Sequence, residues 1–553
     1  MLDRSVGRTY DALRADFVWR IPPDFNIGVA CSDRHPRDAV ALVDCGADPP
    51  RDYTFGQLSD LSNRLGNALR HLGVGAGDPV GIVLPQRVET GIAHLAIYKL
   101  GAIAIPMSGL FGPQALRYRL GDSGSKAVIT DRAHVDAIQD AATDILDLQV
   151  IVVDGPVASP YHSFWALIDD GSADLETART GPDTPALLIY TSGTTGAPKG
   201  ALHGHRVLLG HLPGFQLSHN FFPQPDDRFW TPADWAWIGG LMDALMPSWY
   251  FGRPVVASAR QRFDPEWALR LIESQEVRNV FLPPTVLKMM RQTQTHGSPQ
   301  ALRSVMCGGE SLGEEMLDWA REHLGVTVNE IYGQTEANYV IGNSAEVWDV
   351  RAGSMGRAYP GHDVTVLAGD GAAAPTGEVG EIAVRAGDPV AFLEYWGRPD
   401  ATRAKYTPEG DWLRTGDLGR LDEDGYFWFE SRQDDVINSA GYRIGPAEIE
   451  ECLLQHPTVA MAAAIGVPDP VRGEVVKAFI QLAPGNSASE ALEAEIQHLV
   501  RTRLAAYEYP RQIEFVTSLP LTTTGKIQRR VLREREARSQ TPGVTATRTK
   551  GSP

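Results

Sequence analysis

The chain alternates short apolar runs with segments of helical periodicity, and this alternation limits the folds open to it. The apolar runs are "PVGIVLP" (79–85), "AVITD" (127–131), "VIVVDG" (150–155), "ALLIYT" (186–191) and "NVFLPP" (279–284). Apolar residues recur at helical spacing in residues 55–73 and 266–277. Because strands that alternate with helices commonly pair in parallel, the pattern predicts an α/β fold with mixed or parallel sheets.

A change of pattern near residue 434 predicts a second, smaller domain. An aromatic-rich stretch (424–435) is followed by a helix-like segment (445–456) and two strand-like runs (459–467 and 475–482). At 553 residues the chain is also too long for one ordinary core. We expect a large domain over residues 1–433, a small α+β domain over 434–535, and a flexible tail over 536–553, where large apolar residues are few.

Composition narrows the classes of partner and compartment. The 51 basic and 69 acidic residues give a formal charge of −18, which disfavours nonspecific binding to nucleic acid or to an anionic membrane. The cysteines (Cys31, Cys45, Cys307 and Cys452) lack metal-site spacing, so a reducing cytoplasm is expected. The charged first residues and the lack of a run of about 18 apolar residues predict neither export nor an integral membrane segment.

The stretch "YTSGTTGAPKG" (190–200) follows a predicted strand and has the composition of a phosphate-binding loop. Its glycines let backbone N–H groups approach phosphate, and its hydroxyls and Lys199 add donors and positive charge. A Walker loop needs Lys followed by Ser or Thr, whereas Gly200 follows Lys199 here, so a P-loop kinase is disfavoured. Taken alone, the stretch is either a turn or a phosphate loop.

Further motifs resolve this ambiguity. In chain order they are "CGGES" (307–311), "YGQTE" (332–336), "RTGDLG" (414–419), "SRQDDVINSAGYRIGPAEIE" (431–450) and "LPLTTTGKIQRR" (519–530). Together with the glycine-rich loop, they resemble the signature motifs of the acyl-adenylate-forming (AMP-binding) superfamily. Residues 17–33 are similar to the acetyl-CoA and medium-chain acyl-CoA synthetase branch. The resemblance implies a large adenylate-forming domain followed by a small mobile catalytic domain.

The resemblance implies a reaction in two steps with ATP, Mg²⁺ and CoA. A carboxylate attacks the α-phosphorus of ATP to give acyl-AMP and pyrophosphate, and a thiol then takes the acyl group. Lys526, Glu336 and Thr195 are the implied catalytic residues, with Glu336 and Thr195 near the metal, a hard cation that prefers oxygen ligands. The implied ATP and AMP contacts are Thr191, Ser192, Gly193, Thr194, Thr195, Gly196, Lys199, Gly309, Glu310, Ser311, Tyr332, Gly333, Gln334, Thr335, Asp417, Arg432 and Arg443.

Within this set the resemblance gives several residues distinct roles. Asp417 and Arg432 are implied to hold the ribose, and Tyr332 to stack on adenine. Lys526 is implied to bind the substrate carboxylate and the α-phosphate, a role that suits a flexible ammonium. In isolation, Asp417 would be read as a turn residue, Tyr332 as a core aromatic and Lys526 as a solvated lysine.

The second half-reaction is implied to use another face of the small domain. Ser439, Ala440, Gly441, Tyr442 and Arg472 are the implied CoA contacts, and Asp434 matches the hinge aspartate of the family. A few residues at the end of an element can absorb the backbone change of such a hinge. The loop around Gly441 would otherwise be a turn that precedes a helix near Pro446.

The implied acyl pocket is lined by Trp237, Ile238, Gly239, Gly308 and Gly333. Acetyl-specific relatives have tryptophan where this chain has Gly333, so we expect the glycine to free volume and acetate to be a poor substrate. Trp230, Trp235 and Trp249 lie in the same stretch as Trp237, and core packing is expected for at least two of these four tryptophans.

The sequence therefore predicts a soluble, cytoplasmic acyl-CoA synthetase for medium-chain, branched or aryl acids. The alternatives are an enzyme that loads an acyl-carrier protein, an acetyl- or propionyl-CoA synthetase, and a nucleotide-binding module without catalysis. "PLTTTGK" (520–526) also resembles the recognition pattern of protein lysine acetyltransferases, which predicts such a partner acting on Lys526.

Overall fold

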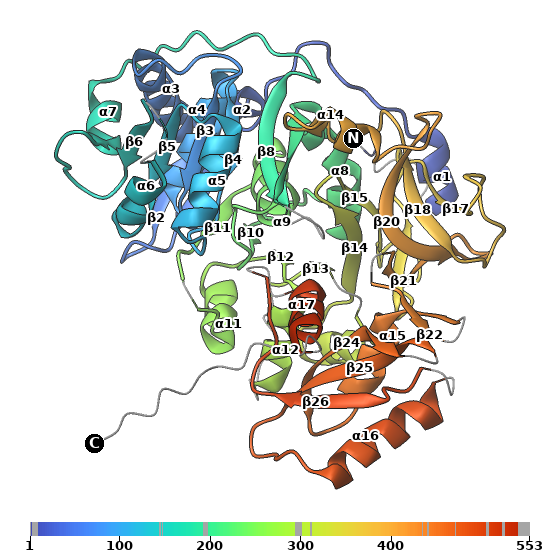
Figure 1. Cartoon of the computed structure of the whole chain (residues 1–553). Coiled ribbons are helices and arrows are strands. Elements are labelled where there is room, and N and C mark those ends of the chain that lie inside the picture. Colours follow the sequence, from blue (N-terminus) through green and yellow to red (C-terminus); the bar gives the residue numbers. More distant parts are fainter. Residues whose placement is uncertain are drawn as a thin grey trace, which may run out of the picture. The chain divides into compact units, whose positions relative to one another are not determined.

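The structure, a computed structural model, describes residues 2, 9–142, 145, 147–191, 197–260, 262–293, 301–309, 312–433, 435–439, 442–469, 472–504, 508–522 and 526–539 (Figure 1). The chain divides into two compact units. Unit 1 comprises Met1–Thr415 and Gly419–Phe429, and unit 2 comprises Gly416–Leu418 and Glu430–Pro553. Among the described residues, no helix is both long and apolar enough to span a membrane.

An eight-stranded sheet of unit 1 carries the glycine-rich loop at one of its hairpins. Its order is β19 (Glu394–Tyr395), β9 (Lys199–Gly204), β8 (Pro185–Thr191), β4 (Ile103–Pro106), β3 (Pro79–Val83), β5 (Ala127–Thr130), β6 (Gln149–Val152) and β7 (His162–Ser163). Neighbouring strands from β8 through β4, β3, β5 and β6 to β7 pair in parallel, whereas β9 pairs antiparallel with β8 and with β19. Four of the predicted strands are thus confirmed.

Both faces of this sheet are covered by helices, as an α/β fold requires (Figure 1). Side chains of α3 (Phe55–His71) and α4 (Val88–Lys99) form one core with Val80 and Ala104. Side chains of α5 (Pro113–Ser123) and α6 (Val135–Ala142) form a separate core with Ile103 and Ile105. Helix α3 begins as predicted because Thr54 and Gln57 form a reciprocal capping box.

A thirteen-stranded mixed sheet forms the rest of the framework of unit 1. Its order is β17 (Val364–Leu367), β18 (Gly380–Arg385), β20 (Trp412–Leu421), β21 (Phe427–Arg432), β16 (Ser354–Ala358), β15 (Ala337–Gly342), β14 (Val328–Gln334), β13 (Ser304–Gly308), β12 (Asn279–Phe281), β10 (Phe229–Trp230), β11 (Val255–Ala257), β1 (Val40–Asp44) and β2 (Arg51–Thr54). Strands β14, β13, β12, β10, β11 and β1 pair in parallel. The carboxyl ends of β12, β13 and β14 therefore lie at one edge, where open α/β sheets commonly bind ligands.

The remaining helices of unit 1 connect and cover the two sheets. They are α1 (Tyr10–Asp16), α2 (Ile27–Ala30), η1 (Arg132–His134), α7 (Phe164–Asp170), α8 (Arg206–Ser218), α9 (Ile238–Gly240), the π-helical turn η2 (Leu241–Leu245), α10 (Met246–Tyr250), α11 (Pro265–Ser274), α12 (Pro284–Gln292), α13 (Glu314–His323) and α14 (Pro399–Arg403). Helix α11 matches the predicted 266–277 segment and is capped by Asp264.

Unit 2 is a small α+β unit with its own cores. Its sheet has the order β23 (Tyr442–Ile444), β22 (Ile437–Ser439), β25 (Gly473–Leu482) and β24 (Val459–Asp469), and β26 (Gln512–Val516) pairs with β25. Helices α15 (Pro446–Leu454) and α16 (Glu490–Arg503) pack on one face. On the other face, Leu532 of α17 (Arg529–Ser539) packs with Phe479.

Helix α17 corrects the predicted start of the tail. It continues to Ser539, whereas the tail was expected from residue 536. The reason is a buried contact, because Lys477 Nζ lies 2.6 Å from Glu536 Oε1. Residues 540–553 lie outside the described residues. The predicted fold class, mixed α/β sheets followed by a small α+β unit, is confirmed.

Candidate active site

The glycine-rich loop connects β8 to β9 in an antiparallel hairpin, with Thr191 opposite Lys199. Ser192, Gly193, Thr194, Thr195 and Gly196 lie outside the described residues. Gly200 is paired with Tyr190 inside the sheet, and a Cβ there would lie 2.8 Å from Leu188 Cδ1. Gly200 is therefore a packing glycine of the hairpin, which corrects the expectation that it frees backbone for a phosphate.

Glu336 lies in the turn between β14 and β15 and is brought next to the exit of this loop by a tyrosine. The Tyr395 hydroxyl donates a hydrogen bond to Glu336 Oε1, and both residues are buried. The Lys199 Nζ lies 5.2 Å from the centre of the Tyr395 ring. The structure thus places Lys199, Tyr395 and Glu336 together, although only the first and last are predicted from sequence.

The donor set at Glu336 fits a hard divalent cation. Its Oε2 atom accepts no hydrogen bond from any residue that the structure describes, so a carboxylate oxygen remains available. Among the described residues, no group of three or more His, Cys, Asp or Glu side chains is arranged to bind a metal ion. Mg²⁺ commonly binds one or two carboxylates together with substrate phosphates and water, so a single protein carboxylate suits it.

Gln334 connects the β14 end to the strand that carries Asp417. Its Nε2 donates to the Thr415 carbonyl at 3.0 Å, and its Oε1 accepts from Lys405 Nζ at 3.0 Å. Lys405 also donates to the carbonyls of Arg414 and Thr415. Gln334 therefore holds the backbone at Thr415 in place. Lys405, which no sequence motif indicated, holds Gln334 and the same stretch of backbone.

The predicted ribose pair is assembled within unit 2. Arg432 Nε lies 3.1 Å from Asp417 Oδ1, and the Gln433 N–H donates to the Gly416 carbonyl at 2.8 Å. Gly416 has a φ of +77°, a conformation that favours glycine. The turn before Asp417 thus holds the carboxylate beside its predicted partner.

The predicted adenine contacts are described in part. Gly309 has a φ of +111°, whereas Glu310 and Ser311 lie outside the described residues. Tyr332 is half-buried in β14, opposite Ile341, and Thr335 follows at the turn of the hairpin. Tyr332 and Gly309 therefore lie at the same carboxyl edge of the sheet.

The predicted CoA contacts are brought close together in the sheet of unit 2. Ser439 of β22 pairs with Gly473 of β25, and Arg472 precedes Gly473. The Arg472 N–H donates to Asp469 Oδ1 at 2.8 Å. Ala440 and Gly441 lie outside the described residues, as do the side chains of Tyr442 and Arg443.

Lys526 lies on an exposed hairpin that leads into α17. The Thr522 N–H donates to the Lys526 carbonyl at 2.7 Å, and the Lys526 N–H donates to Thr522 Oγ1 at 3.0 Å. A bridge between Leu521 and Ile527 closes the hairpin. These bonds fix the backbone of Lys526, which is an exposed residue.

Asp434, the predicted hinge residue, lies outside the described residues, but its neighbour Asp435 forms ion pairs with α17. Asp435 Oδ2 accepts from Arg529 at 3.2 Å, and Asp435 Oδ1 pairs with Arg533. Arg529 also pairs with Glu450 of α15 at 2.5 Å. Burial raises the pKa of Glu450, an effect that Arg529 opposes.

The predicted acyl-pocket residues lie around the carboxyl ends of β12, β13 and β14. A Cβ at Gly239 would lie 2.9 Å from the Phe281 ring, and a Cβ at Gly308 would lie 2.7 Å from Ile331. Trp237 precedes α9 and meets Phe111 edge to face at 5.9 Å. The residues that the resemblance assigns to the acyl pocket therefore come from α9 and the segment just before it, from β13 and from β14.

Gly333 packs closely against the β14–β15 hairpin. A Cβ at Gly333 would lie 2.4 Å from the Tyr339 nitrogen and 2.7 Å from Asn338 Oδ1. The β14–β15 hairpin has an irregular register between Tyr332 and Gln334, which brings Asn338 against the glycine. The hairpin backbone and a polar amide thus lie directly against Gly333, and the larger pocket stays a prediction.

The tryptophan interpretation is confirmed. Trp230, Trp235 and Trp249 are fully buried, and the Trp249 indole donates to the Ala41 carbonyl at 2.7 Å. Trp237 alone among the four is partly exposed.

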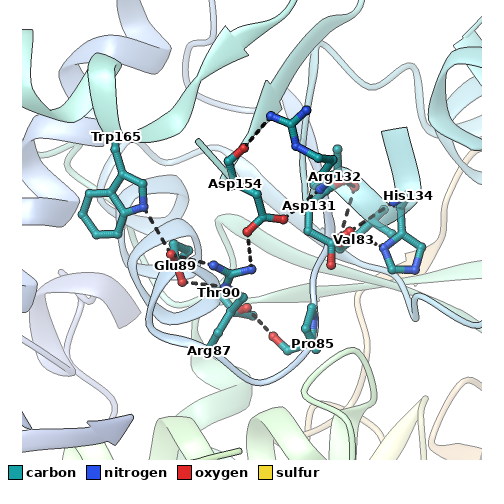
Figure 2. A network of polar contacts seen from close by, with 11 residues as sticks. Val83, Pro85, Arg87, Glu89, Thr90, Asp131, Arg132, His134, Asp154 and Trp165 are labelled. Atoms are coloured by element: carbon teal, nitrogen blue, oxygen red, sulfur yellow. Dashed lines mark hydrogen bonds and ion pairs between the residues drawn. The ribbon is translucent and has the colours of Figure 1, made fainter. Parts of the chain in front are cut away.

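A second polar cluster lies at the carboxyl ends of β3, β5 and β6 (Figure 2). Arg87 donates to both oxygens of Glu89 and to Asp154 Oδ1, at 2.7 to 2.9 Å. Asp154 Oδ2 accepts from the Arg132 N–H at 2.9 Å, and the Trp165 indole donates to Glu89 at 3.2 Å. Each carboxylate oxygen of Glu89 and Asp154 accepts a hydrogen bond from another residue of the chain, so this cluster is a structural network that stabilises the loops.

Sequence and structure comparisons agree with this arrangement. Residues 30–396 match the model of the AMP-binding enzyme family, and residues 448–526 match the model of the AMP-binding enzyme C-terminal domain. The chain belongs to the AMP-binding enzyme family. It is an AMP-forming acid–thiol ligase that uses ATP, Mg²⁺ and CoA, as the sequence predicted.

Individual relatives cover nearly the whole chain. An uncharacterized acyl-CoA ligase of Bacillus subtilis is 36% identical over 490 residues, which are 88% of this chain and 90% of the relative. The solved anthranilate CoA ligase AuaEII, in complex with anthranoyl-AMP, is 31% identical with a TM-score of 0.86, covering 94% of this chain and 98% of that one. A benzoate CoA ligase from Burkholderia xenovorans is 27% identical with a TM-score of 0.81, covering 92% and 100%.

Proposed function

We propose that the chain converts an aryl, medium-chain or branched carboxylic acid to its CoA thioester through an acyl-AMP intermediate. The observation that carries the ligase chemistry is the juxtaposition of Lys199, Tyr395 and Glu336 beside the glycine-rich loop. ATP and the attacking carboxylate are both anions, so positioning and charge neutralisation supply most of the rate. A buried carboxylate for the metal and a lysine for phosphate charge meet both requirements.

In the first half-reaction, the residues of the chain hold the nucleotide and the acid. Asp417, oriented by Arg432, accepts hydrogen bonds from the ribose hydroxyls, and Lys199 adds positive charge near the phosphates. Glu336, together with Thr195 of the loop, holds Mg²⁺, which supplies neutralisation of the phosphate oxygens when bound. Lys526 balances the charge that develops on the substrate carboxylate and α-phosphate.

In the second half-reaction, a CoA thiol attacks the carbonyl of acyl-AMP and AMP leaves. Ser439, Gly441 and Arg472 belong to the stretch proposed to contact CoA, and the register of β22 against β25 supports this grouping. Asp434 is the proposed hinge between the two half-reactions. Its neighbour Asp435 connects this position to α17.

Two observations support an aryl acid within the proposed class. The relatives include ligases whose names specify anthranilate and benzoate. In this chain the Phe281 ring lies against Gly239, and flat aromatic surfaces suit planar acyl groups. The irregular hairpin at Gly333 leaves a polar wall in the same region.

We also propose that a protein lysine acetyltransferase acts on Lys526. The side chain belongs to an exposed residue on a short hairpin, which gives a modifying enzyme access. Acetylation removes the charge that adenylation needs. Peptide mapping after incubation with such an enzyme and acetyl-CoA should find the modification at Lys526 together with a loss of activity.

The experiment that tests the function is a substrate panel with separate product assays. AMP, pyrophosphate and acyl-CoA are measured with ATP, Mg²⁺ and CoA for acetate, butyrate, isobutyrate, hexanoate, octanoate, benzoate, anthranilate and laurate. We expect AMP and acyl-CoA with aryl or four- to eight-carbon acids and little product with acetate. ADP in place of AMP would contradict the proposal, and pyrophosphate exchange without acyl-CoA would indicate an acyl-carrier protein as acceptor.

A further inference from the structure

A buried carboxylate and a buried amide each lie beside one of the glycines assigned to the acyl pocket. Asp243 of η2 is 2% exposed, and its Oδ2 atom lies 3.6 Å from the position of a Cβ at Gly239. Asn338 of β15 is also buried, and its Oδ1 lies 2.7 Å from the position of a Cβ at Gly333. Asn338 Nδ2 donates to Asp243 Oδ1 at 2.7 Å, which joins the two side chains.

A third residue, His211 of α8, fixes the orientation of this pair. Its Nδ1 lies 2.7 Å from the Val207 carbonyl, which can only accept, so Nδ1 carries the hydrogen. Burial lowers the pKa of His211 to about 4, so the ring is neutral and Nε2 is an acceptor. Asn338 Nδ2 lies 3.2 Å from Nε2, so one amide hydrogen goes to His211 and the other to Asp243.

The directions of these bonds leave two acceptors turned toward the glycines. Neither Asp243 Oδ2 nor Asn338 Oδ1 accepts a hydrogen bond from any residue within the described ranges. Burial also raises the pKa of Asp243 well above its usual range, an effect that the hydrogen bond from Asn338 opposes. Acceptor atoms that lack a protein donor on largely buried side chains are costly to folding, and such costs are commonly retained at binding sites.

The cluster of Figure 2 shows what a purely structural network looks like in this protein. There, Glu89 and Asp154 each have both oxygens hydrogen-bonded within the chain. The Asp243 network instead ends in acceptors, although Asp243 is as deeply buried as Glu89. The difference indicates that a donor from outside the protein completes it.

We propose that the acid substrate carries a hydroxyl or amino group that donates hydrogen bonds to Asp243 and Asn338. These two residues would then determine specificity, with His211 as a positioning residue that orients the Asn338 amide. The inference rests on the proposed function, because it takes Gly239 and Gly333 as neighbours of the acyl group. It narrows the substrate class to aryl or aliphatic acids with a donor substituent.

Matched acids test the inference directly on the wild-type protein. The value of kcat/KM for AMP formation is compared for benzoate, its hydroxy, amino and methoxy derivatives, and for hexanoate and 6-hydroxyhexanoate. We expect at least one donor-bearing acid to exceed its parent by about 10-fold or more, and its methoxy analogue to gain nothing. Parent acids that are used as well as all of their donor-bearing derivatives would overturn the inference.

An Asp243→Asn variant separates recognition from general damage. The new amide keeps its oxygen toward the Asn338 donor and turns its NH₂ group toward Gly239, so the advantage of the donor-bearing acid should fall by about 10-fold. The parent acid serves as an internal measure of folding and chemistry. Asp227→Asn is the matched control, because Asp227 is an equally buried aspartate that precedes β10 at the amino edge of the sheet and pairs with Arg303. It should leave the ratio between the two acids unchanged.

Binding measurements keep the inference separate from the proposed function. If no acid gives AMP, the proposed function fails, and calorimetric dissociation constants for benzoate and the hydroxybenzoates still decide the inference. Tighter binding of a donor-bearing acid to wild type, lost in Asp243→Asn, would support it. Equal binding of all the acids by both proteins would overturn it.

Discussion

Tyr395 donates a hydrogen bond to Glu336, although the two residues are 59 positions apart in the chain. The contact exists because β19 pairs with β9, which places Tyr395 opposite Ala201 and near Lys199. The N–H of Phe392 also donates to the Glu336 carbonyl at 2.8 Å, so the same segment holds both the backbone and the side chain of Glu336. A carboxylate fixed in this way can present its other oxygen to a metal ion.

A Tyr395→Phe variant should weaken the metal site without unfolding the protein. The substitution removes only the hydroxyl, which leaves the Glu336 carboxylate without the donor that orients it. Residues that orient metal ligands typically contribute about 10- to 100-fold to metal affinity or activity. We expect ATP–pyrophosphate exchange to fall by about 10-fold at limiting Mg²⁺ and to recover partly as Mg²⁺ is raised.

Tyr161→Phe is the control for this prediction. Tyr161 also donates a hydrogen bond from its hydroxyl, to Gln139 at 2.9 Å, but outside the site. The control variant should keep the wild-type Mg²⁺ dependence. A Tyr395→Phe protein with an unchanged Mg²⁺ titration would show that the tyrosine does not act through Glu336.

The strands of the core could be predicted because burial on both faces leaves a continuous apolar signal. The segments 79–85 and 127–131 are both central strands of the eight-stranded sheet. The motif residues Asp417 and Arg432 could likewise be assigned from the family pattern, and the structure brings them together. Features of this kind can be predicted because each depends on short-range periodicity or on a sequence motif.

Tyr395, Lys405 and Asn338 could not be predicted from the sequence. Each contacts residues that are distant in the chain, such as Gln334 for Lys405 and Asp243 for Asn338, and none lies at a distinctive spacing. The contact of Gly333 with the β14–β15 hairpin could not be predicted either, because an alignment shows the missing side chain but not the backbone that packs against it. The neighbouring Tyr339 has a φ of +64°, an unusual conformation for a bulky residue that no composition rule reveals.

Lys526→Ala should separate the two half-reactions. In the proposed mechanism, the lysine balances charge during acyl-AMP formation, whereas the thiol step uses another face of unit 2. We expect ATP–pyrophosphate exchange to fall by about 100-fold or more, the usual scale for removing a preorganised charge. Thioester formation from preformed acyl-AMP and CoA should stay within a few-fold of wild type, measured by acyl-CoA release.

Arg530→Ala provides the matched control for Lys526. Arg530 is an exposed cation of the same segment, and its Nε lies 3.6 Å from Glu534 Oε1 at the surface. Its loss should leave both half-reactions intact. Equal damage to both half-reactions in Lys526→Ala would contradict a role confined to adenylation.

Arg529→Met should destabilise the protein more at about pH 8 than at about pH 5. The change leaves Glu450 and Asp435 without their shared cation, and breaking a mostly buried pair costs about 3 kcal/mol. Burial raises the pKa of Glu450, so the folded state binds the proton more tightly than the unfolded state does. Its contribution is therefore present at low pH and is lost as pH rises through the folded pKa.

Removing Arg529 raises the pKa of Glu450 further, so the loss of stability relative to wild type is larger at the higher pH. Melting temperatures of wild type, Arg529→Met and the exposed control Arg530→Met at the two pH values measure the effect. The control should match wild type at both. A deficit for Arg529→Met that is independent of pH would indicate lost packing of the arginine side chain instead of uncompensated carboxylates.

Asp243→Asn should make the protein more stable at neutral pH while it loses substrate discrimination. Burial raises the pKa of Asp243 well above its usual value, so the native state holds the proton more tightly than the unfolded state. The contribution of Asp243 to stability is thus present below about pH 4 and is lost as pH rises through the folded pKa. An amide does not titrate and avoids this loss, which we expect to be worth about 1 to 3 kcal/mol.

Denaturant unfolding from about pH 4 to pH 8 tests this sign. The difference between Asp243→Asn and wild type should be small at the acid end and favour the variant as pH rises. Asp227→Asn should behave in the opposite way, because it removes the partner of Arg303, which lies 2.7 Å from Asp227. If Asp243→Asn were instead less stable at pH 8, the carboxylate would be a structural acceptor for Asn338, and its placement beside Gly239 would need no ligand to explain it.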